Sequence, residues 1–139
     1  VVICARDAGR ARDSLADIAG RAGIELLVQP FGRPPDLPDA WAGRADLLIS
    51  TVPVDLPPYL AAALVRQAAT VFEVVYNNYP SRLDRAARAA GVRSLDGLDM
   101  LVGQAIDQIR LMTGRDADPA PLLAACRAEV MRRKTGRES

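Results

Sequence analysis

The feature that most constrains the fold of this chain is the alternation of short apolar runs with longer segments of helical spacing. Five runs rich in branched apolar residues are predicted to be strands, at residues 1–5, 24–28, 46–51, 70–76 and 92–95. Five segments with helix-start and helix-end signals are predicted to be helices, at residues 6–23, 57–68, 80–91, 96–114 and 119–134. Apolar strands that alternate with helices predict an α/β fold, in which helices cover both faces of a parallel sheet.

Composition and charge exclude several classes of protein. The 139 residues suffice for one domain with a core, and a formal net charge of +1 gives no field that would attract nucleic acid or an anionic membrane. The chain has no histidine, no cysteine spacing typical of a metal site, and no apolar run near the ~20 residues of a membrane span. Cys4 and Cys126 are predicted to be buried thiols, and a cytoplasmic protein is expected. Because the first residue is valine, we also expect the chain to be a piece of a longer one.

Parallel sheets bind ligands at the carboxyl ends of their strands, so the residues just after each strand are the candidate site. Arg6 and Arg10 follow the first strand and would suit the 2'-phosphate of an adenosine. The alternative is a solvated helix start, in which these cations pair with Asp7 and Asp13.

Later strand ends carry weaker signals. Ser50 and Thr51 offer small polar groups, Tyr76 could project its hydroxyl into a cleft, and Gly97 would allow a ligand to approach closely. Taken singly, these residues fit equally well as turn residues, the edge of a core, and the start of a helix.

The predicted helix over residues 96–114 contains a polar residue beside its apolar stripe. The stripe has spacings of three and four residues and consists of Leu98, Leu101, Ala105, Ile109 and Met112. Gln104 lies inside or beside it, and a buried amide without partners would cost roughly 1–3 kcal/mol. The spacing leaves two interpretations open, a contact with substrate and an amide satisfied within the structure.

Three stretches carry a resemblance to a known family. The segments "DLLISTVP", "VFEVVYNNYPSRLDRAARAAGVRSLDGLDMLVGQA" and "IRLMTGRDADP" resemble, in order and spacing, the nicotinamide-cofactor domain of the shikimate dehydrogenase family. The resemblance covers nearly the whole chain and implies two α/β domains that flank a cleft. It implies reversible, NADP-dependent hydride transfer between shikimate and 3-dehydroshikimate, a step of aromatic amino-acid biosynthesis. The family's catalytic Lys and Asp lie in an N-terminal substrate domain outside this chain, so we expect no catalytic residue here and no activity from this piece alone.

The resemblance also implies a role for particular residues. Arg6 and Arg10 match the turn that binds the 2'-phosphate, although Asp7 adds a negative charge there, so NADP is expected with NAD as the alternative. Three consecutive residues after the third strand match the turn that borders the nicotinamide ribose: Ser50, Thr51 and Val52.

The remaining implied roles concern the nicotinamide and the substrate. Gly97 and Met100 match positions that pack on the nicotinamide. Tyr76 and Gln104 match substrate-binding positions, and an amide with one acceptor and two donors suits neighbouring hydroxyls. The expected partner is therefore a small hydroxy acid, and neither nucleic acid nor a membrane. No residue is predicted to bind a metal.

One expected element is missing from the predicted sheet. The family's Gly-rich turn and the central strand before it have no counterpart in residues 1–139, which we interpret as a partial dinucleotide-binding domain with C-terminal helices. The strands at 1–5 and 46–51 would then face each other across about two strand spacings, ~9–10 Å. We expect them to pair directly, to borrow a strand from another copy in a homodimer or strand-swapped assembly, or to be completed by a longer chain. The functional alternatives are a quinate/shikimate-type relative and a non-catalytic nucleotide-binding remnant.

Overall fold

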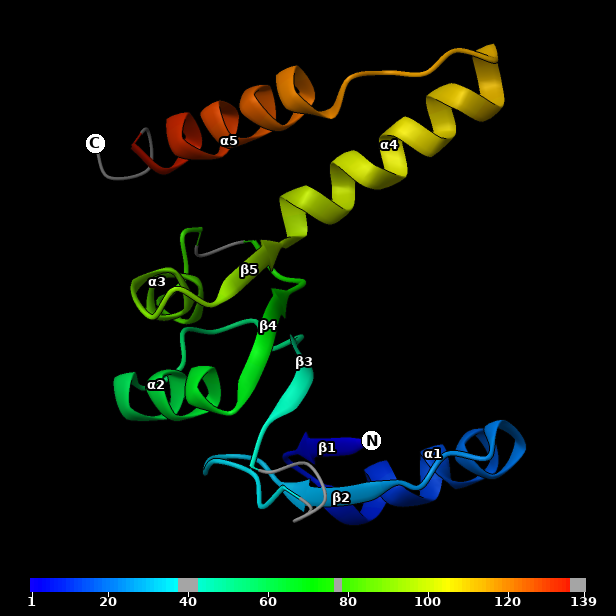
Figure 1. Ribbon diagram of the computed structural model, residues 1–139, viewed down its shortest axis with the longest axis vertical. Helices are drawn as coiled ribbons and strands as arrows, with labels where there is room; N and C mark the ends of the chain where they lie inside the picture. The colour runs from blue at the N-terminus through cyan, green and yellow to red at the C-terminus, as the bar shows by residue number, and fades with distance from the viewer. Residues whose placement is uncertain (38–42, 77–78, 136–139) are drawn as a thin grey trace.

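The computed structural model describes residues 1–37, 43–76 and 79–135, and in them the predicted alternation of strands and helices is confirmed (Figure 1). The strands are β1 (Val2–Ala5), β2 (Leu27–Pro30), β3 (Ala45–Ser50), β4 (Ala68–Glu73) and β5 (Arg93–Asp96). The helices are α1 (Ala8–Ala22), α2 (Pro58–Arg66), α3 (Arg82–Ala89), α4 (Gly97–Thr113) and α5 (Pro119–Thr135).

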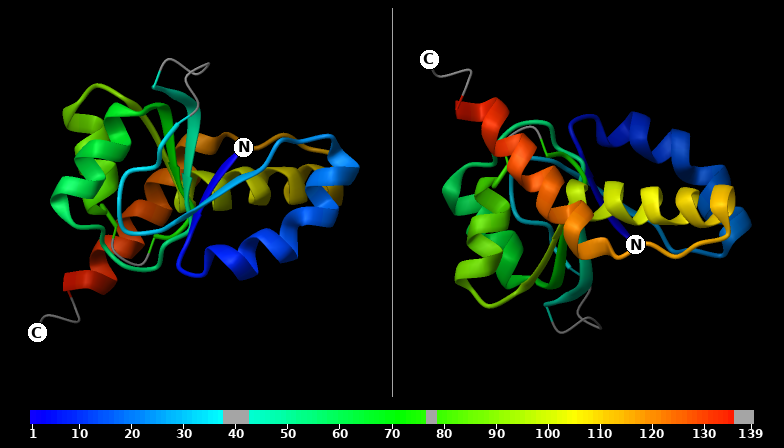
Figure 2. Two further views of the ribbon diagram at one scale, coloured as in Figure 1. Left: turned by 90° about the horizontal axis from the view of Figure 1, so that it is seen from below. Right: turned by 90° about the horizontal axis from the view of Figure 1, so that it is seen from above.

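The strands form two parallel sheets. Strand β1 pairs with β2, and β3, β4 and β5 pair in that order, with Leu47 opposite Thr70 and Val71 opposite Ser94. Figure 2 shows α2 and α3 on one face of the strands and α1 and α4 on the other. The predicted fold class, a parallel α/β arrangement with helices on both faces, is therefore confirmed.

The two sheets do not join into one. Within the described parts of the chain, no backbone hydrogen bond links β1 to β3. The first of the three expectations, direct pairing of these two strands, is therefore wrong. A cavity of about 870 Å³ separates them, and it is lined by residues 1–4, by all of β3 and by Leu56 and Leu60. The edges of β1 and β3 that face this cavity are therefore unpaired in the described residues.

The segment after β2 connects the two sheets. Phe31 packs against the main core, the Tyr59 hydroxyl donates to the Gly32 carbonyl at 3.1 Å, and the Gln67 amide donates to the Pro35 carbonyl at 3.2 Å. Through these contacts β2 is held to α2 although β1 and β3 do not touch through their backbones.

The hydrophobic core lies between the three-stranded sheet and the two helices that cover it. Its fully buried members include Leu60 and Val65 of α2, Val71 of β4, and Leu83 and Ala87 of α3. None of the described residues of α1 is buried to the same degree. The packing therefore fixes the ends of β3, β4 and β5 more firmly than those of β1 and β2.

Some strand boundaries differ from the predictions. Strand β2 begins at Leu27 and not at Ile24, because Gly23 ends α1 in a left-handed conformation and the Ile24 amide donates to the Ala19 carbonyl. Strand β4 starts two residues early and ends at Glu73, while β5 is shifted by one residue to Arg93–Asp96. These errors are small because the apolar runs mark the strands, whereas caps and turns set their ends.

Two further expectations concern the cysteines and the membrane. Cys4 and Cys126 are half-buried and not fully buried, since Cys4 faces the cavity beside β3 and Cys126 lies on the peripheral α5. Burial still raises the pKa of the Cys4 thiol above its ordinary value. Among the described residues, no helix is both long and apolar enough to span a bilayer.

Candidate functional site

The carboxyl ends of β3, β4 and β5 meet at one edge of the sheet. The Val74 amide, just after β4, donates to the Ser50 carbonyl at 2.9 Å, and Glu73 is in register with Asp96, the last residue of β5. Gly97 then begins α4 directly. The predicted residues Ser50, Tyr76 and Gly97 are therefore brought to the same edge.

Gly97 is the tightest position at this edge. A Cβ atom built on it would lie 2.1 Å from the Val74 carbonyl oxygen and 2.8 Å from Cδ1 of Tyr76. The chain's own backbone and the Tyr76 ring occupy the space beside this glycine, and the approach of a ligand to Gly97 stays a prediction. Tyr76 is 40% exposed, and its hydroxyl has no hydrogen-bond partner among the described residues, so it is free to contact a ligand.

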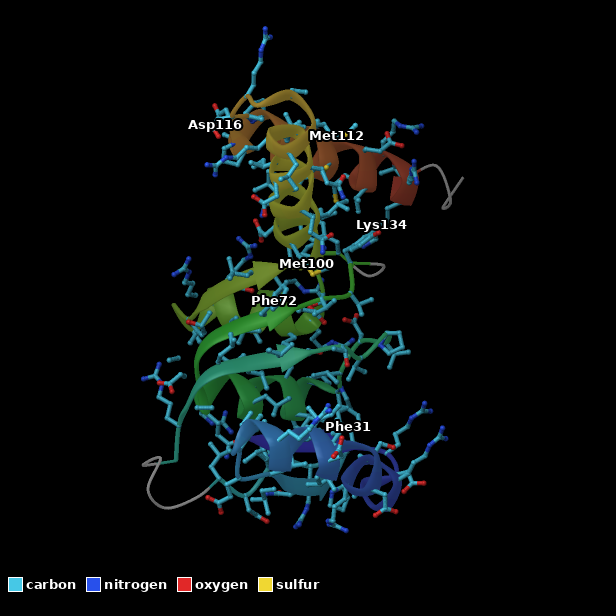
Figure 3. The ribbon with its side chains drawn as sticks, turned by 90° about the vertical axis from the view of Figure 1, so that its right-hand side faces the viewer. Phe31, Phe72, Met100, Met112, Asp116 and Lys134 are labelled. Carbon is cyan, nitrogen blue, oxygen red and sulfur yellow. The ribbon has the colours of Figure 1, made fainter. Side chains whose placement is uncertain are left out.

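The start of α4 is held by two carboxylates. Asp96 accepts from the amides of Leu98 at 2.8 Å and Asp99 at 3.0 Å, while the Asp99 carboxylate accepts from the Asp96 amide at 2.9 Å. This reciprocal capping box fixes the direction in which α4 leaves the sheet. Met100 is half-buried in the next turn, at the base of α4 above the strands (Figure 3).

The apolar stripe predicted for α4 is partly wrong. The buried apolar side chains of α4 are Leu98, which belongs to the predicted stripe, and Val102, which does not. Two predicted members lie at the surface, since Leu101 is 43% exposed and Met112 is 85% exposed. Gln104 is exposed as well, so its amide does not need a partner inside this chain. Substrate contact by Gln104 stays a prediction.

Arg6 and Arg10 lie on the other side of the cavity, at the end of β1 and in the first turn of α1. Both are exposed, and their side chains form no hydrogen bond or ion pair with any described residue, which argues against pairing with Asp7 or Asp13. Asp7 is the N-cap of α1, and its carboxylate accepts from the Arg10 amide at 2.9 Å. The two guanidinium groups therefore remain available to an anion.

Ser50 and the two residues after it border the cavity between the sheets. Ser50 is only 7% exposed, yet its hydroxyl has no hydrogen-bond partner among the described residues. A buried polar atom without a protein partner is uncommon, which makes the Ser50 hydroxyl a candidate for contact with a ligand or an ordered water. Thr51 is exposed and Val52 half-buried, and both line the same cavity.

Glu73 lies at the same edge of the sheet and was not predicted from the sequence as a site residue. It is buried at the end of β4, where the Ser81 hydroxyl donates to its carboxylate. The Ser81 oxygen also caps α3 by accepting from the Asp84 amide at 3.0 Å. Burial raises the pKa of Glu73, and the negative charges of Asp55, Asp84 and Asp96 raise it further. The hydrogen bond from Ser81 lowers this pKa, but it does not cancel the increase.

Arg127 is the second functional candidate that the sequence did not reveal. It lies on α5, and its guanidinium group is 3.4 Å from the Asp96 carboxylate and 3.3 Å from that of Asp99. Nothing in the sequence links Asp96 and Asp99 to a cation about thirty residues away. In the described residues, no group of acidic or sulfur side chains could hold a metal ion.

Comparison with known proteins identifies the arrangement. Residues 97–127, from the start of α4 to Arg127, match the family model of the shikimate 5'-dehydrogenase C-terminal domain. A shikimate dehydrogenase (NADP(+)) from Maricaulis maris is 36% identical over 135 residues, covering 94% of this chain and 44% of the relative. A quinate/shikimate dehydrogenase (NAD(+)) from Corynebacterium glutamicum is 35% identical over 117 residues, covering 81% of this chain and 40% of the relative.

A solved structure agrees with these sequence matches. The crystal structure of a shikimate 5-dehydrogenase from Mycobacterium fortuitum superposes with a TM-score of 0.68 and 37% identity, covering 89% of this chain and 45% of that one. The chain thus spans less than half the length of these relatives, at their C-terminal end. On these grounds the chain is similar, over most of its length, to the C-terminal part of shikimate dehydrogenases.

Proposed function

We propose that this chain is the cofactor-binding part of a shikimate dehydrogenase-like enzyme, which transfers hydride reversibly between shikimate and NADP to give 3-dehydroshikimate and NADPH. The observation that carries the proposal is the meeting of Ser50, Tyr76 and Gly97 at one sheet edge, with two hydroxyls that lack partners among the described residues. Relatives of the same family are named for this activity. The reaction would be a step of aromatic amino-acid biosynthesis in the cytoplasm.

The described residues suit a phosphorylated dinucleotide. Arg6 and Arg10 would hold the 2'-phosphate, since both guanidinium groups are exposed and unpaired among the described residues. The turn from Ser50 to Val52 would border the nicotinamide ribose, with the buried Ser50 hydroxyl as a donor. Gly97 and Met100 would pack on the nicotinamide, and the bound cofactor would supply the hydride acceptor or donor.

Tyr76 and Gln104 would orient the substrate. Both side chains are exposed, and a hydroxyl and an amide together offer donors and acceptors to a polyol acid. The acid and base that move the substrate proton would come from a second domain. The 139-residue chain by itself is therefore expected to be catalytically silent.

We further propose that residues 1–139 form a partial dinucleotide-binding domain, completed by one more parallel strand between β1 and β3. Both facing edges carry unpaired backbone groups, and the cavity between them is lined largely by apolar side chains of residues 1–4 and β3. A strand from a preceding segment would complete the sheet. Exchange of a strand with a second copy, in a homodimer, is the competing arrangement.

The test uses the product of the complete reading frame that encodes this chain. We expect it to oxidise shikimate with NADP⁺, followed by NADPH absorbance, and to bind NADP⁺ more tightly than NAD⁺ in calorimetric titrations. Replacing Arg6 and Arg10 together by alanine should lower NADP⁺ affinity about tenfold or more, because charge-assisted contacts to the phosphate are lost, and should leave NAD⁺ affinity unchanged.

Arg21→Ala is the matched control, because Arg21 is an exposed arginine at the far end of α1 that pairs with Asp17. Absence of both binding and oxidation in the wild-type product would refute the proposed function. Oxidation of shikimate by the 139-residue chain alone would refute its assignment as the cofactor-binding part.

A second candidate is an NAD-dependent enzyme acting on quinate and shikimate. It is favoured by Asp7, because an acidic residue after the second strand of such folds commonly binds the free 2'-hydroxyl of NAD. The capping role of Asp7 in α1 weighs against it, since the carboxylate is already occupied by the Arg10 amide. Equal or tighter binding of NAD⁺ in the titrations, with faster oxidation of quinate than of shikimate, would establish this alternative.

A further inference from the structure

The junction of β5, α4 and α5 has an unusual charge arrangement. Two carboxylates, those of Asp96 and Asp99, flank the Gly97 position and are both committed to capping α4. The side chain of Asp96 is only 4% exposed and that of Asp99 is 24% exposed. Two negative charges this close and this buried need a cation, because they repel each other and water cannot screen them well.

Arg127 is the cation that the fold supplies. Its guanidinium group reaches both carboxylates from α5, and among the described residues no other cation forms an ion pair with either of them. Its own Nε atom is buried without a partner, so the side chain is inserted into the junction and does not lie loosely over it. The other ion pair close to this edge, Arg88 with Asp84, belongs to α3 and is already formed.

From this arrangement we infer that Arg127 is a positioning residue: it neutralises the capping-box carboxylates at the start of α4 and thereby sets the balance between oxidised and reduced cofactor at the neighbouring Gly97–Met100 turn. The inference rests on the proposed function, which puts the nicotinamide ring at that turn. The oxidised ring carries a positive charge and the reduced ring carries none. The potential at the start of α4 therefore acts on one redox form and not on the other.

The sign of the effect follows from the charges. With Arg127 in place, its positive charge offsets one of the two carboxylates, and the oxidised ring is only moderately favoured. Loss of that positive charge leaves a more negative junction, which attracts the cationic oxidised ring and does not act on the neutral reduced ring. A unit charge within about one helical turn should change the ratio of the two affinities about fivefold at an effective dielectric constant between those of water and protein.

The experiment measures dissociation constants for NADP⁺ and NADPH with the product of the complete reading frame. Arg127→Gln keeps a hydrogen-bond donor but loses the charge, Arg127→Lys keeps the charge, and Arg133→Gln is the control. Arg133 is an exposed arginine of the same helix that pairs with Glu129 instead. We expect Arg127→Gln to shift the ratio about fivefold toward NADP⁺ binding, and Arg127→Lys and Arg133→Gln to leave it near the wild-type value.

A purely structural role would give a different result. If Arg127 only packed α5 against α4, Arg127→Gln would weaken both redox forms equally and leave their ratio unchanged, and that outcome would overturn the inference. An equally large shift of the ratio in Arg133→Gln would also overturn the inference, because the shift would then depend on the net charge of the chain and not on the position of Arg127.

Asp99→Asn provides a test that does not depend on how Arg127→Gln folds. It removes one negative charge while its side-chain oxygen can still accept from the Asp96 amide, so the ratio should move in the opposite direction, toward NADPH. In the double variant with Arg127→Gln, the ratio should return toward wild type, and failure of both effects would refute the inference. A wild-type product that binds neither redox form would instead refute the proposed function.

Discussion

Replacing Gly97 with alanine should be strongly destabilising, because there is no room for a methyl group at this position. The added carbon would lie 2.1 Å from the Val74 carbonyl oxygen and 2.8 Å from the Tyr76 ring. The ring can rotate aside, but the carbonyl belongs to the backbone that continues β4 and is fixed by the adjacent bond from the Val74 amide to Ser50. The start of α4 must therefore move away from the sheet.

The size of the effect follows from the kind of obstacle. Overpacking in a core typically costs about 1–3 kcal/mol, and a backbone obstacle favours the upper end, about 3 kcal/mol. Because the melting temperature of a chain of this length shifts by roughly 3 °C per kcal/mol, the expected decrease is about 10 °C. The same displacement would disrupt the capping box of Asp96 and Asp99, which adds to the loss.

Gly103→Ala is the matched control on the same helix. A Cβ atom built at Gly103 has no heavy atom within 4 Å, so alanine there should stabilise the helix by about 0.5–1 kcal/mol. Urea unfolding followed by circular dichroism at 222 nm, a standard helix wavelength, gives the free energy of unfolding of both variants. Opposite signs are expected, and a Gly97→Ala variant as stable as wild type would refute the proposed packing.

A second variant separates the two obstacles. Tyr76→Ala removes the ring but leaves the Val74 carbonyl in place. Gly97→Ala should therefore remain destabilising in the Tyr76→Ala background, although by less than in the wild type. Full rescue would mean that the ring, and not the backbone, limits the approach of α4 to the sheet.

Three further predictions concern the same half of the molecule. The raised pKa of Glu73 means that the folded state favours the protonated side chain. The stabilisation from this protonated side chain is therefore present in acid and is lost as the pH rises above the ordinary pKa of glutamate. Glu73→Gln should accordingly melt higher than wild type at pH 7 and equally near pH 4, measured by thermal unfolding at both pH values. Ser50→Ala should leave the melting temperature unchanged without cofactor, because the hydroxyl has no partner to lose, but should weaken NADP⁺ binding by the complete product in calorimetric titrations. Ile49→Lys should reduce self-association of the 139-residue chain in sedimentation velocity, because Ile49 is 55% exposed beside the unpaired β3 edge and a lysine blocks edge pairing.

The order of strands and helices could be predicted from the sequence, because it depends on local patterns of apolar residues. The runs at residues 46–51 and 70–76 became β3 and β4, because branched apolar residues favour the extended backbone of a strand. Their ends were harder to predict, since they depend on hydrogen bonds between elements. The Val74 amide, for example, bonds to Ser50 on another strand, and no pattern near Val74 indicates it.

The candidate site was only partly visible in the sequence, for a related reason. The rule that ligands bind at the carboxyl ends of parallel strands selected Ser50, Tyr76 and Gly97, which the fold does bring to one edge. Arg127 could not be found in this way, because its partners lie 28 and 31 residues earlier in the chain.

The apolar stripe predicted for α4 was partly wrong for a simpler geometric reason. Spacings of three and four residues from Leu98 fit both Leu101 and Val102, and only the position of the sheet and of α5 decides between them. The fold buries Val102 and exposes Leu101, which turns Gln104 toward solvent. The interpretation of Gln104 as a buried amide is therefore wrong, because it depended on the predicted stripe. The proposed contact of Gln104 with substrate is compatible with this result, because it requires an exposed side chain.

The clearest conflict between sequence and structure lies in β3. Its apolar residues Leu47 and Ile49 are typical of a strand buried in the middle of a sheet, yet they are 48% and 55% exposed. Both line the cavity that separates β3 from β1, whose own edge is also unpaired. A sequence suited to a central strand and a structure that makes it an edge strand are reconciled if another strand fills the cavity. Such a strand would bury Leu47 and Ile49 and would place its carboxyl end between Arg6 on one side and Ser50 on the other, where the proposed dinucleotide would have to cross from one sheet to the other.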